Sequence, residues 1–98
     1  MRRIQRAKRL FMLTDNGIKN CNYWFPSGVP LYATMEERVY YVLYRSVISF
    51  EERKPLSFGQ ICRFVKEYLK EMDSEKIKLI KSILYEGKEK GYIEIIKC

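Results

Sequence analysis

Hydrophobic residues recur at helical spacing over most of the chain after residue 33. Thr34 is followed three residues later by Glu37, which matches a capping box and predicts a first helix from near Met35 to about Phe50. This stretch is apolar almost all round, a pattern that is typical of a helix covered on both sides. We expect the N-terminal segment or another subunit to supply the second cover.

Two further helices are predicted after the polar connector EERKPLS, whose last residues are expected to form a short extended piece. Ser57 is a suitable N-cap, and the apolar residues from Phe58 to Met72 share one face by the i, i+3, i+4 rule. The pair Asp73-Ser74 ends that segment and caps a third helix, expected over about residues 75–90 and stopped by Gly91. The following YIEIIKC is rich in β-branched residues and is predicted to be a strand.

The first thirty residues have a different pattern. The stretches RLFMLT and IKNCNYWF flank Asp15, Asn16 and Gly17, and an Asn-Gly pair favours the positive φ angles of a tight hairpin turn. A β-hairpin is therefore predicted here, with a helix over residues 2–12 as the competing interpretation. PSGVP breaks the chain at residues 26–30, which separates a basic and aromatic segment, 1–30, from a domain over 31–98.

Composition limits the chain to one core and favours an anionic partner. The 98 residues allow a single modest core, and a hydrophobic fraction of 47% is typical of a globular chain. The 19 Lys and Arg residues outnumber the 12 Asp and Glu residues, giving a formal net charge of +7. Nucleic acid is the first candidate partner and an acidic membrane surface the second. Because no apolar run reaches the length of a membrane span or a signal peptide, we expect an intracellular protein, cytoplasmic or nucleoid-associated.

The three cysteines are isolated and histidine is absent, so a structural metal site is not expected. Cys62 falls on an apolar helix face, as a small core residue does. Cys98 has two interpretations, a free thiol or an intersubunit disulfide. The second is kept open because the chain is rich in Ile, Lys, Glu and Tyr, a bias of hyperthermophile proteins, in which intracellular disulfides occur.

The third predicted helix has two different faces. At about 100° per residue, one broad apolar arc contains Ile77, Leu79, Ile80, Ile83, Leu84 and Gly87. The opposite, narrower arc contains Lys78, Lys81, Tyr85 and Lys88, with Ser82 beside them. An ordinary solvated face mixes both signs of charge to gain i, i+4 pairs, and this one does so less than expected. It is either a lysine-rich solvated surface or a surface for an anion.

The second half of the chain resembles the winged helix-turn-helix family of DNA-binding proteins. The resemblance covers about residues 34–98 and lies in SFGQICRFVKEYL as the supporting helix, EMDSE as the turn, KIKLIKSILYEGKEK as the recognition helix and GYIEIIKC as the strand that leads into the wing. It implies a mainly α fold with a small amount of β structure, namely three helices and a short sheet that includes the C-terminal strand. The returning second wing strand has no counterpart after Cys98, so the N-terminal hairpin or a partner subunit is expected to replace it.

The resemblance also implies a binding mode for double-stranded DNA and a role in transcription regulation. The third helix would enter the major groove, with Lys78, Lys81, Ser82, Tyr85 and Lys88 facing the duplex. Arg63, Lys66 and Lys70 on the second helix would lie against backbone phosphates. Arg2, Arg3 and Arg6 are either an arm that follows the DNA or a solvated terminus.

The tyrosines of the first helix also have two interpretations. They stack on unpaired bases, or they pack in an interface, and the second is favoured because the helix is expected to be covered. Since helix-turn-helix proteins usually act as two-fold dimers, Tyr40, Tyr44 and Ile48 are predicted to lie in a homodimer contact.

An enzyme is the least favoured class. The chain has no histidine, no glycine-rich phosphate loop and no paired carboxylates in an apolar setting. No cofactor and no small-molecule ligand are indicated. The alternative to a DNA-binding protein is a protein-interaction or assembly module on the same scaffold.

Overall fold

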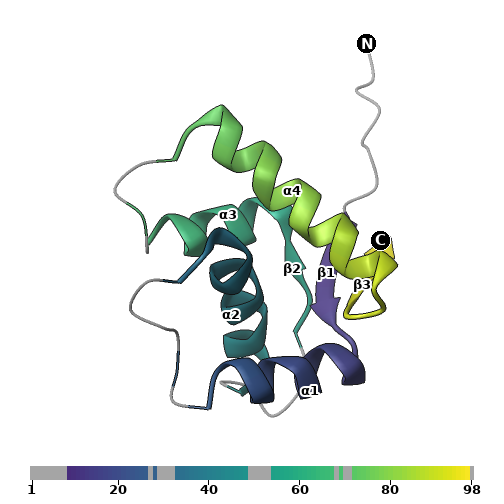
Figure 1. The fold of residues 1–98 in the computed structure, drawn as a ribbon. Coiled ribbons are helices and arrows are strands. Elements are labelled where there is room, and N and C mark those ends of the chain that lie inside the picture. Colours follow the sequence, from purple (N-terminus) through teal and green to yellow (C-terminus); the bar gives the residue numbers. More distant parts are fainter. Residues whose placement is uncertain are drawn as a thin grey trace.

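The computed structural model describes residues 9–26, 28, 33–48, 54–67, 69 and 72–97. In this part of the chain it has four helices and a three-stranded antiparallel sheet (Figure 1). The mainly helical fold with a small sheet was predicted, but there is one helix more than expected. The elements in chain order are β1 (Arg9–Leu13), α1 (Asp15–Trp24), α2 (Met35–Ile48), β2 (Leu56–Ser57), α3 (Phe58–Lys66), α4 (Ser74–Glu89) and β3 (Ile93–Lys97).

The sheet has the order β2-β1-β3, so the strand from the beginning of the chain lies in its centre. β1 pairs with β3 along its whole length, from Arg9 opposite Lys97 to Leu13 opposite Ile93. The short β2 pairs with the other edge of β1, with Leu56 opposite Phe11. The strand predicted at the C-terminus is confirmed, and its partner comes from the N-terminal segment.

The predicted hairpin is wrong, because Asp15–Trp24 is a helix and not the second strand of a pair. Thr14 is its N-cap, and its Oγ1 accepts a hydrogen bond from the Gly17 amide at 3.1 Å. Asn16 and Gly17 thus lie in the first turn of a helix and not in a hairpin turn. The Thr14 side chain satisfies the Gly17 N–H, one of the backbone donors that have no partner within the helix. The competing helix over residues 2–12 is also wrong for residues 9–12, which lie in β1.

The caps of the other helices confirm the sequence signals. The capping box of α2 is complete, since Glu37 N donates to Thr34 Oγ1 at 3.2 Å and Thr34 N donates to Glu37 Oε1 at 3.0 Å. Ser57 forms the same kind of box at the start of α3, and Asp73 caps α4. Gly91, with φ of 80°, follows α4 as predicted.

The second predicted helix is shorter than expected. α3 ends at Lys66, and the Glu67 amide bonds to the Phe64 and Val65 carbonyls in place of continuing the helix. Leu69 and Met72 still pack against the core, but they do so from the connection to α4. Apolar spacing alone predicted that they lay on the helix.

The core lies between the helices and one face of the sheet. In Figure 1, α4 runs along the top of the molecule and α1 along the bottom, with α2 between them. Among the described residues, no helix is both long and apolar enough to cross a membrane. The fully buried side chains of the core are Phe11, Leu13, Cys21, Val39, Tyr40, Leu43, Ile61, Val65, Ile80, Leu84 and Ile93, each less than or equal to 2% exposed.

Candidate nucleic-acid interface

The predicted recognition helix, α4, is anchored along one side and open along the other. It packs against α2 and β3 through the buried residues Ile80, Ile83, Leu84 and Gly87. With 16 residues and a rise of about 1.5 Å per residue, it is about 24 Å long. An α-helix of this kind fits the major groove of B-DNA, which is about 12 Å wide.

The open side of α4 carries the predicted basic strip. Lys78, Lys81, Ser82 and Lys88 are all exposed, as the periodicity predicted. Lys76, by contrast, lies 3.6 Å from the Asp73 carboxylate, next to the N-cap. This side of α4 therefore exposes three lysines and one hydroxyl, together with the carboxylates of Glu75, Glu86 and Glu89.

Tyr85 lies at the border between this strip and the sheet. It is half-buried, and its hydroxyl oxygen accepts a hydrogen bond from Arg9 Nη1 at 2.5 Å. Its ring meets Phe11 edge to face, with 6.2 Å between ring centroids. Because the hydroxyl oxygen is used by Arg9, Tyr85 keeps its own O–H as a donor.

The sheet adds two cations that the sequence analysis did not include in the site. Arg9 and Lys97 face each other across β1 and β3, and both are exposed. The bond from Arg9 to Tyr85 places this end of the sheet beside α4. Only the pairing of residues from opposite ends of the chain brings these charges together, and no local pattern shows it.

On α3, the predicted phosphate contacts Arg63 and Lys66 are exposed at the end of the helix. The connection between α3 and α4 spans residues 67–73, and this is longer than the turn of roughly three or four residues that joins many helix-turn-helix pairs. The other predicted DNA contacts, Lys70, Arg2, Arg3 and Arg6, lie outside the described residues, as does Cys98.

The predicted apolar arc of α4 was too broad. Leu79 is 47% exposed and Ile77 is 39% exposed, although both were expected to face the core. Leu79 lies about 100° around the helix from Ile80, beyond the contact with α2 and β3. Ile77 lies in the first turn, ahead of the residues that reach the core. Phe64 on α3 is also 39% exposed, so three apolar side chains are accessible on these two helices.

The predicted homodimer contact is wrong for Tyr40, which is 2% exposed and belongs to the core of its own chain. Its ring meets Trp24 at 5.5 Å and Tyr92 at 6.4 Å between centroids, and burial raises its pKa. Neither a second subunit nor an unpaired base can reach it. The reason is α1, a helix absent from the prediction, which covers this side of α2.

Tyr44, half-buried, donates a hydrogen bond from its hydroxyl to Asn22 Oδ1 on α1, and the side chain of Ile48 is not described. The N-terminal segment therefore supplies the second cover of α2, one of the two sources that were predicted.

The described cysteines have no reactive surroundings. Cys21 is buried, and burial raises the pKa of its thiol to about 12. Cys62 is half-buried, and its pKa is also raised by burial. Within the described ranges, no group of three His, Cys, Asp or Glu side chains is arranged to hold a metal ion.

Comparison of the chain with protein-family models, with curated proteins and with solved structures found no match in any of the three.

Proposed function

We propose that this protein binds double-stranded DNA in a sequence-specific manner, inserting α4 into the major groove, and that it regulates transcription as a homodimer. The observation that carries the proposal is the exposed strip of Lys78, Lys81, Ser82 and Lys88 along one side of a helix whose other side is anchored in the core. A rigid helix with outward cations can approach two phosphate backbones without rearrangement.

The arrangement of elements supports a winged-helix type of scaffold. The order α2, β2, α3, α4, β3 follows the resemblance. β1 runs antiparallel to β3 over the register that a returning wing strand would take. In this proposal the N-terminal strand replaces the second wing strand, and the wing is formed by segments from both ends of the chain.

Each exposed group has a distinct role in the proposed complex. Lysines on α4 bind phosphates or guanine edges, while Ser82 and the Tyr85 hydroxyl donate hydrogen bonds to bases. Arg63 and Lys66 on α3 hold the backbone and set the register. Arg9 and Lys97 add positive charge at the end of the sheet where β1 begins.

One observation favours a second function. Phe64, Ile77 and Leu79 are apolar and exposed on α3 and α4, the same helices that carry the cations. Exposed apolar residues beside lysines also suit an acidic protein partner with an apolar contact, as in an assembly module. The two functions differ in their response to salt.

The first experiment is a salt series of binding to random duplex DNA. Counterion release predicts that log affinity falls against log salt with a slope of about 0.9 for each phosphate neutralised. Lys81→Ala/Lys88→Ala should therefore lower the slope by about 1.8, if each lysine neutralises one phosphate. Lys19→Ala on α1, an exposed lysine far along the chain from α4, is the matched control and should leave the slope unchanged.

Two results would reject DNA binding by α4. The first is no binding at low salt by a protein whose circular dichroism shows intact helices. The second is an equal loss of slope for the Lys19 control and for each α4 lysine. Binding to an acidic protein that changes little with salt would instead favour the interaction module.

A second experiment distinguishes base-specific contacts from general electrostatic attraction to the DNA phosphates. Tyr85→Phe removes only the hydroxyl and keeps the ring contact with Phe11, and Ser82→Ala removes the other proposed reader. Both should reduce discrimination among sequences, each by about 1–3 kcal/mol if a base-specific contact is lost, whereas Lys66→Ala should weaken binding to all sequences alike. Uniform losses for all three variants would reject the assignment of α4 as the reading helix.

A further inference from the structure

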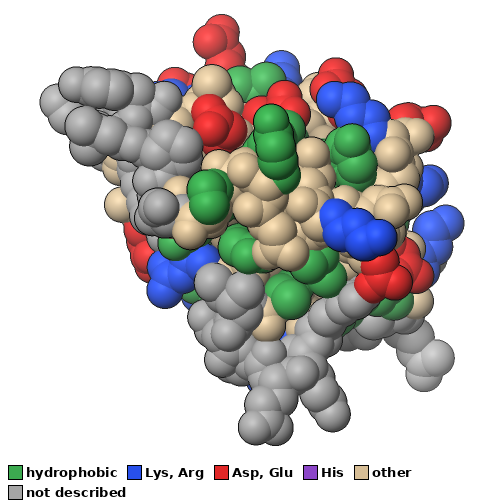
Figure 2. All heavy atoms as spheres, turned by 60° about the horizontal axis from the view of Figure 1, so that its bottom comes forward, with side chains coloured by type: hydrophobic (Ala, Val, Ile, Leu, Met, Phe, Trp, Pro, Cys, Tyr) green, Lys and Arg blue, Asp and Glu red, His purple; other side chains and the backbone are tan. Residues whose placement is uncertain are grey.

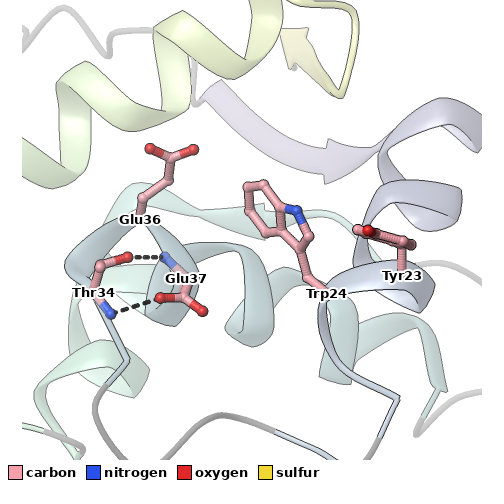
Figure 3. A pocket seen from close by; sticks show the side chains of 5 residues that line it. All are labelled: Tyr23, Trp24, Thr34, Glu36 and Glu37. Atoms are coloured by element: carbon pink, nitrogen blue, oxygen red, sulfur yellow. Dashed lines mark hydrogen bonds between the residues drawn. The ribbon is translucent and has the colours of Figure 1, made fainter.

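An open hollow lies between the C-terminal end of α1 and the N-terminal end of α2. It has a volume of about 560 Å³, within the range of roughly 300–1,000 Å³ that is usual for ligand sites. Figure 3 shows Tyr23 and Trp24 on the α1 side and the carboxylate of Glu36 on the α2 side. Thr34 and Glu37 complete the described lining. The hollow thus joins aromatic surface to acidic side chains.

The aromatic wall is held in place from behind. The Trp24 ring meets Tyr40 edge to face at 5.5 Å and Phe25 at 6.1 Å between centroids, and it remains half-buried. Tyr23, at the rim, is 83% exposed. An indole fixed by two buried rings presents its free surface without a loss of rotamer freedom on binding.

The acidic side has one carboxylate that the fold does not use for capping. Glu37 is engaged with the Thr34 amide in the capping box, whereas Glu36 takes no part in that box (Figure 3). Glu36 is half-buried, and its charge contributes to raising the pKa of Tyr40, after the larger effect of burial. Glu36 therefore lies close to Tyr40, the ring that packs behind Trp24.

The ends of the two helices affect the site in opposite ways. The C-terminal end of α1 carries partial negative charge, and its last turn contains no basic residue to offset this. The N-terminal end of α2 carries partial positive charge, and both carboxylates of its first turn, Glu36 and Glu37, lie near it. Only Glu37 closes the capping box, so the Glu36 carboxylate and the α1 terminus are the groups that can attract a cation to the hollow.

In Figure 2, where the lower side of Figure 1 is turned toward the reader, hydrophobic side chains are exposed over the middle, and the acidic side chains along the upper part lie among basic ones. This face therefore carries both signs of charge, and the negative charge argued here comes from Glu36 and the α1 terminus, which lie next to the hollow.

We propose that the hollow binds an arginine side chain from a basic segment of a partner protein. A guanidinium stacks on the face of tryptophan by a cation–π contact and also forms paired hydrogen bonds with a carboxylate, and both groups are present here. Lysine forms only a point contact with each group, which is why arginine is the better fit. The proposal concerns α1 and α2 and is independent of DNA binding by α4.

Trp24 makes the test direct, because it is the single tryptophan of the chain. Its fluorescence is followed while a capped peptide, Gly-Arg-Gly-Arg-Gly, is added at constant ionic strength. The matched probe has citrulline in place of arginine, which keeps the shape and removes the charge. We expect a saturable change in emission with the arginine peptide and no saturation with the citrulline peptide.

Two exposed or half-exposed positions supply the variants. Glu36→Gln should weaken binding of the arginine peptide about tenfold, which corresponds to about 1.4 kcal/mol. Tyr23→Ala removes an exposed ring and should also weaken binding with the fold intact. Glu94→Gln, the same change of charge at an exposed residue of β3, is the control and should bind as the original protein does.

Three results would overturn the proposal. These are an equal response to the arginine and citrulline peptides, an equal effect of Glu36→Gln and Glu94→Gln, and a response that appears only after Arg2, Arg3 and Arg6 are replaced. The last would mean that the protein's own basic segment, not a partner, occupies the hollow. The peptide titration is repeated on Lys81→Ala/Lys88→Ala, in which it should be unchanged, so that a failure of DNA binding and a failure of peptide binding are told apart.

Discussion

Gly17 offers a sharp test of how α1 is seated on the rest of the molecule. A Cβ atom at this position would lie 2.1 Å from the backbone oxygen of Tyr92 and 3.0 Å from its carbonyl carbon. The obstacle is backbone, so no side-chain rotation can remove it. Gly17→Ala must push α1 away from the segment that leads into β3.

The cost follows from the contacts at this point. Overpacking a well-filled site usually costs about 1–3 kcal/mol. The Tyr92 oxygen also accepts a hydrogen bond from the Thr14 amide at 3.0 Å, and its loss adds about 0.5–1.5 kcal/mol. The higher helix propensity of alanine stabilises the folded state by at most about 1 kcal/mol and offsets part of this loss. Gly17→Ala should therefore lower the free energy of unfolding by about 0.5–4.5 kcal/mol, with a central value of about 2 kcal/mol.

Gly59 is the matched control, because it also lies in the first turn of a helix but a Cβ there would meet nothing within 4 Å. Gly59→Ala should be neutral or stabilising, by up to about 1 kcal/mol. Urea unfolding of both variants is followed by Trp24 fluorescence and by far-ultraviolet circular dichroism. For a chain of this size, about 1 kcal/mol shifts the Tm by about 4–8 °C, so the two variants should move the Tm in opposite directions or differ by more than about 8 °C. Equal stability of Gly17→Ala and Gly59→Ala would show that α1 does not contact Tyr92 as described.

Three further predictions concern a cap, a carboxylate and a thiol. Ser57→Ala, which removes the capping box of α3, should cost about 1 kcal/mol in urea unfolding, and a change below about 0.3 kcal/mol would contradict it. The hydrogen bond from the Lys76 amide lowers the pKa of Asp73 in the folded protein. The ionised Asp73 carboxylate therefore stabilises the fold at pH values above its unfolded pKa, and this stabilisation is lost as the pH falls through its folded pKa. The difference in unfolding midpoint between the original protein and Asp73→Asn should accordingly change as pH falls below about 4, and a constant difference would refute this. Cys21, whose pKa burial raises to about 12, should resist alkylation at neutral pH until the protein unfolds, whereas the half-buried Cys62 should react earlier; mass spectrometry of the labelled peptides decides the order.

Local signals were sufficient for the helices of the second half of the chain. The caps at Thr34, Ser57 and Asp73 each act within three residues, and all three form the predicted bonds. The exposed side of α4 also followed from periodicity, because a helix anchored on one side must expose the other. Sequence reasoning therefore located the basic strip, although the arc assigned to the core was too broad at Leu79.

The errors came from pairings between distant parts of the chain. A strand at Arg9–Leu13 was part of the predicted hairpin, but its partner lies at Ile93–Lys97, and no local pattern states which strand will meet which. Once β3 occupies that edge of β1 and β2 the other, Asp15–Trp24 cannot be a neighbouring strand and takes the helix that Thr14 caps. The placement of Tyr40 failed for the same reason, since α1 was missing from the prediction. The aromatic and acidic hollow could not be foreseen either, because Trp24 and Glu36 line the same hollow only after α1 packs on α2.

The central position of β1 has a consequence for the proposed DNA complex. Arg9 bonds to Tyr85 on α4, and Phe11 in the same strand packs against the Tyr85 ring, so two contacts join β1 to this side of α4. Arg9 is therefore held at a fixed point relative to α4. Loss of the Arg9–Tyr85 bond, for example in Arg9→Gln, removes one charge and also one of the two contacts that position the Tyr85 side chain. The salt slope should then fall by about 0.9 if only the phosphate contact matters, and discrimination among sequences should fall as well if the bond positions Tyr85. A lower slope with unchanged discrimination would show that Arg9 contributes charge alone and that Tyr85 is held by its packing against Phe11.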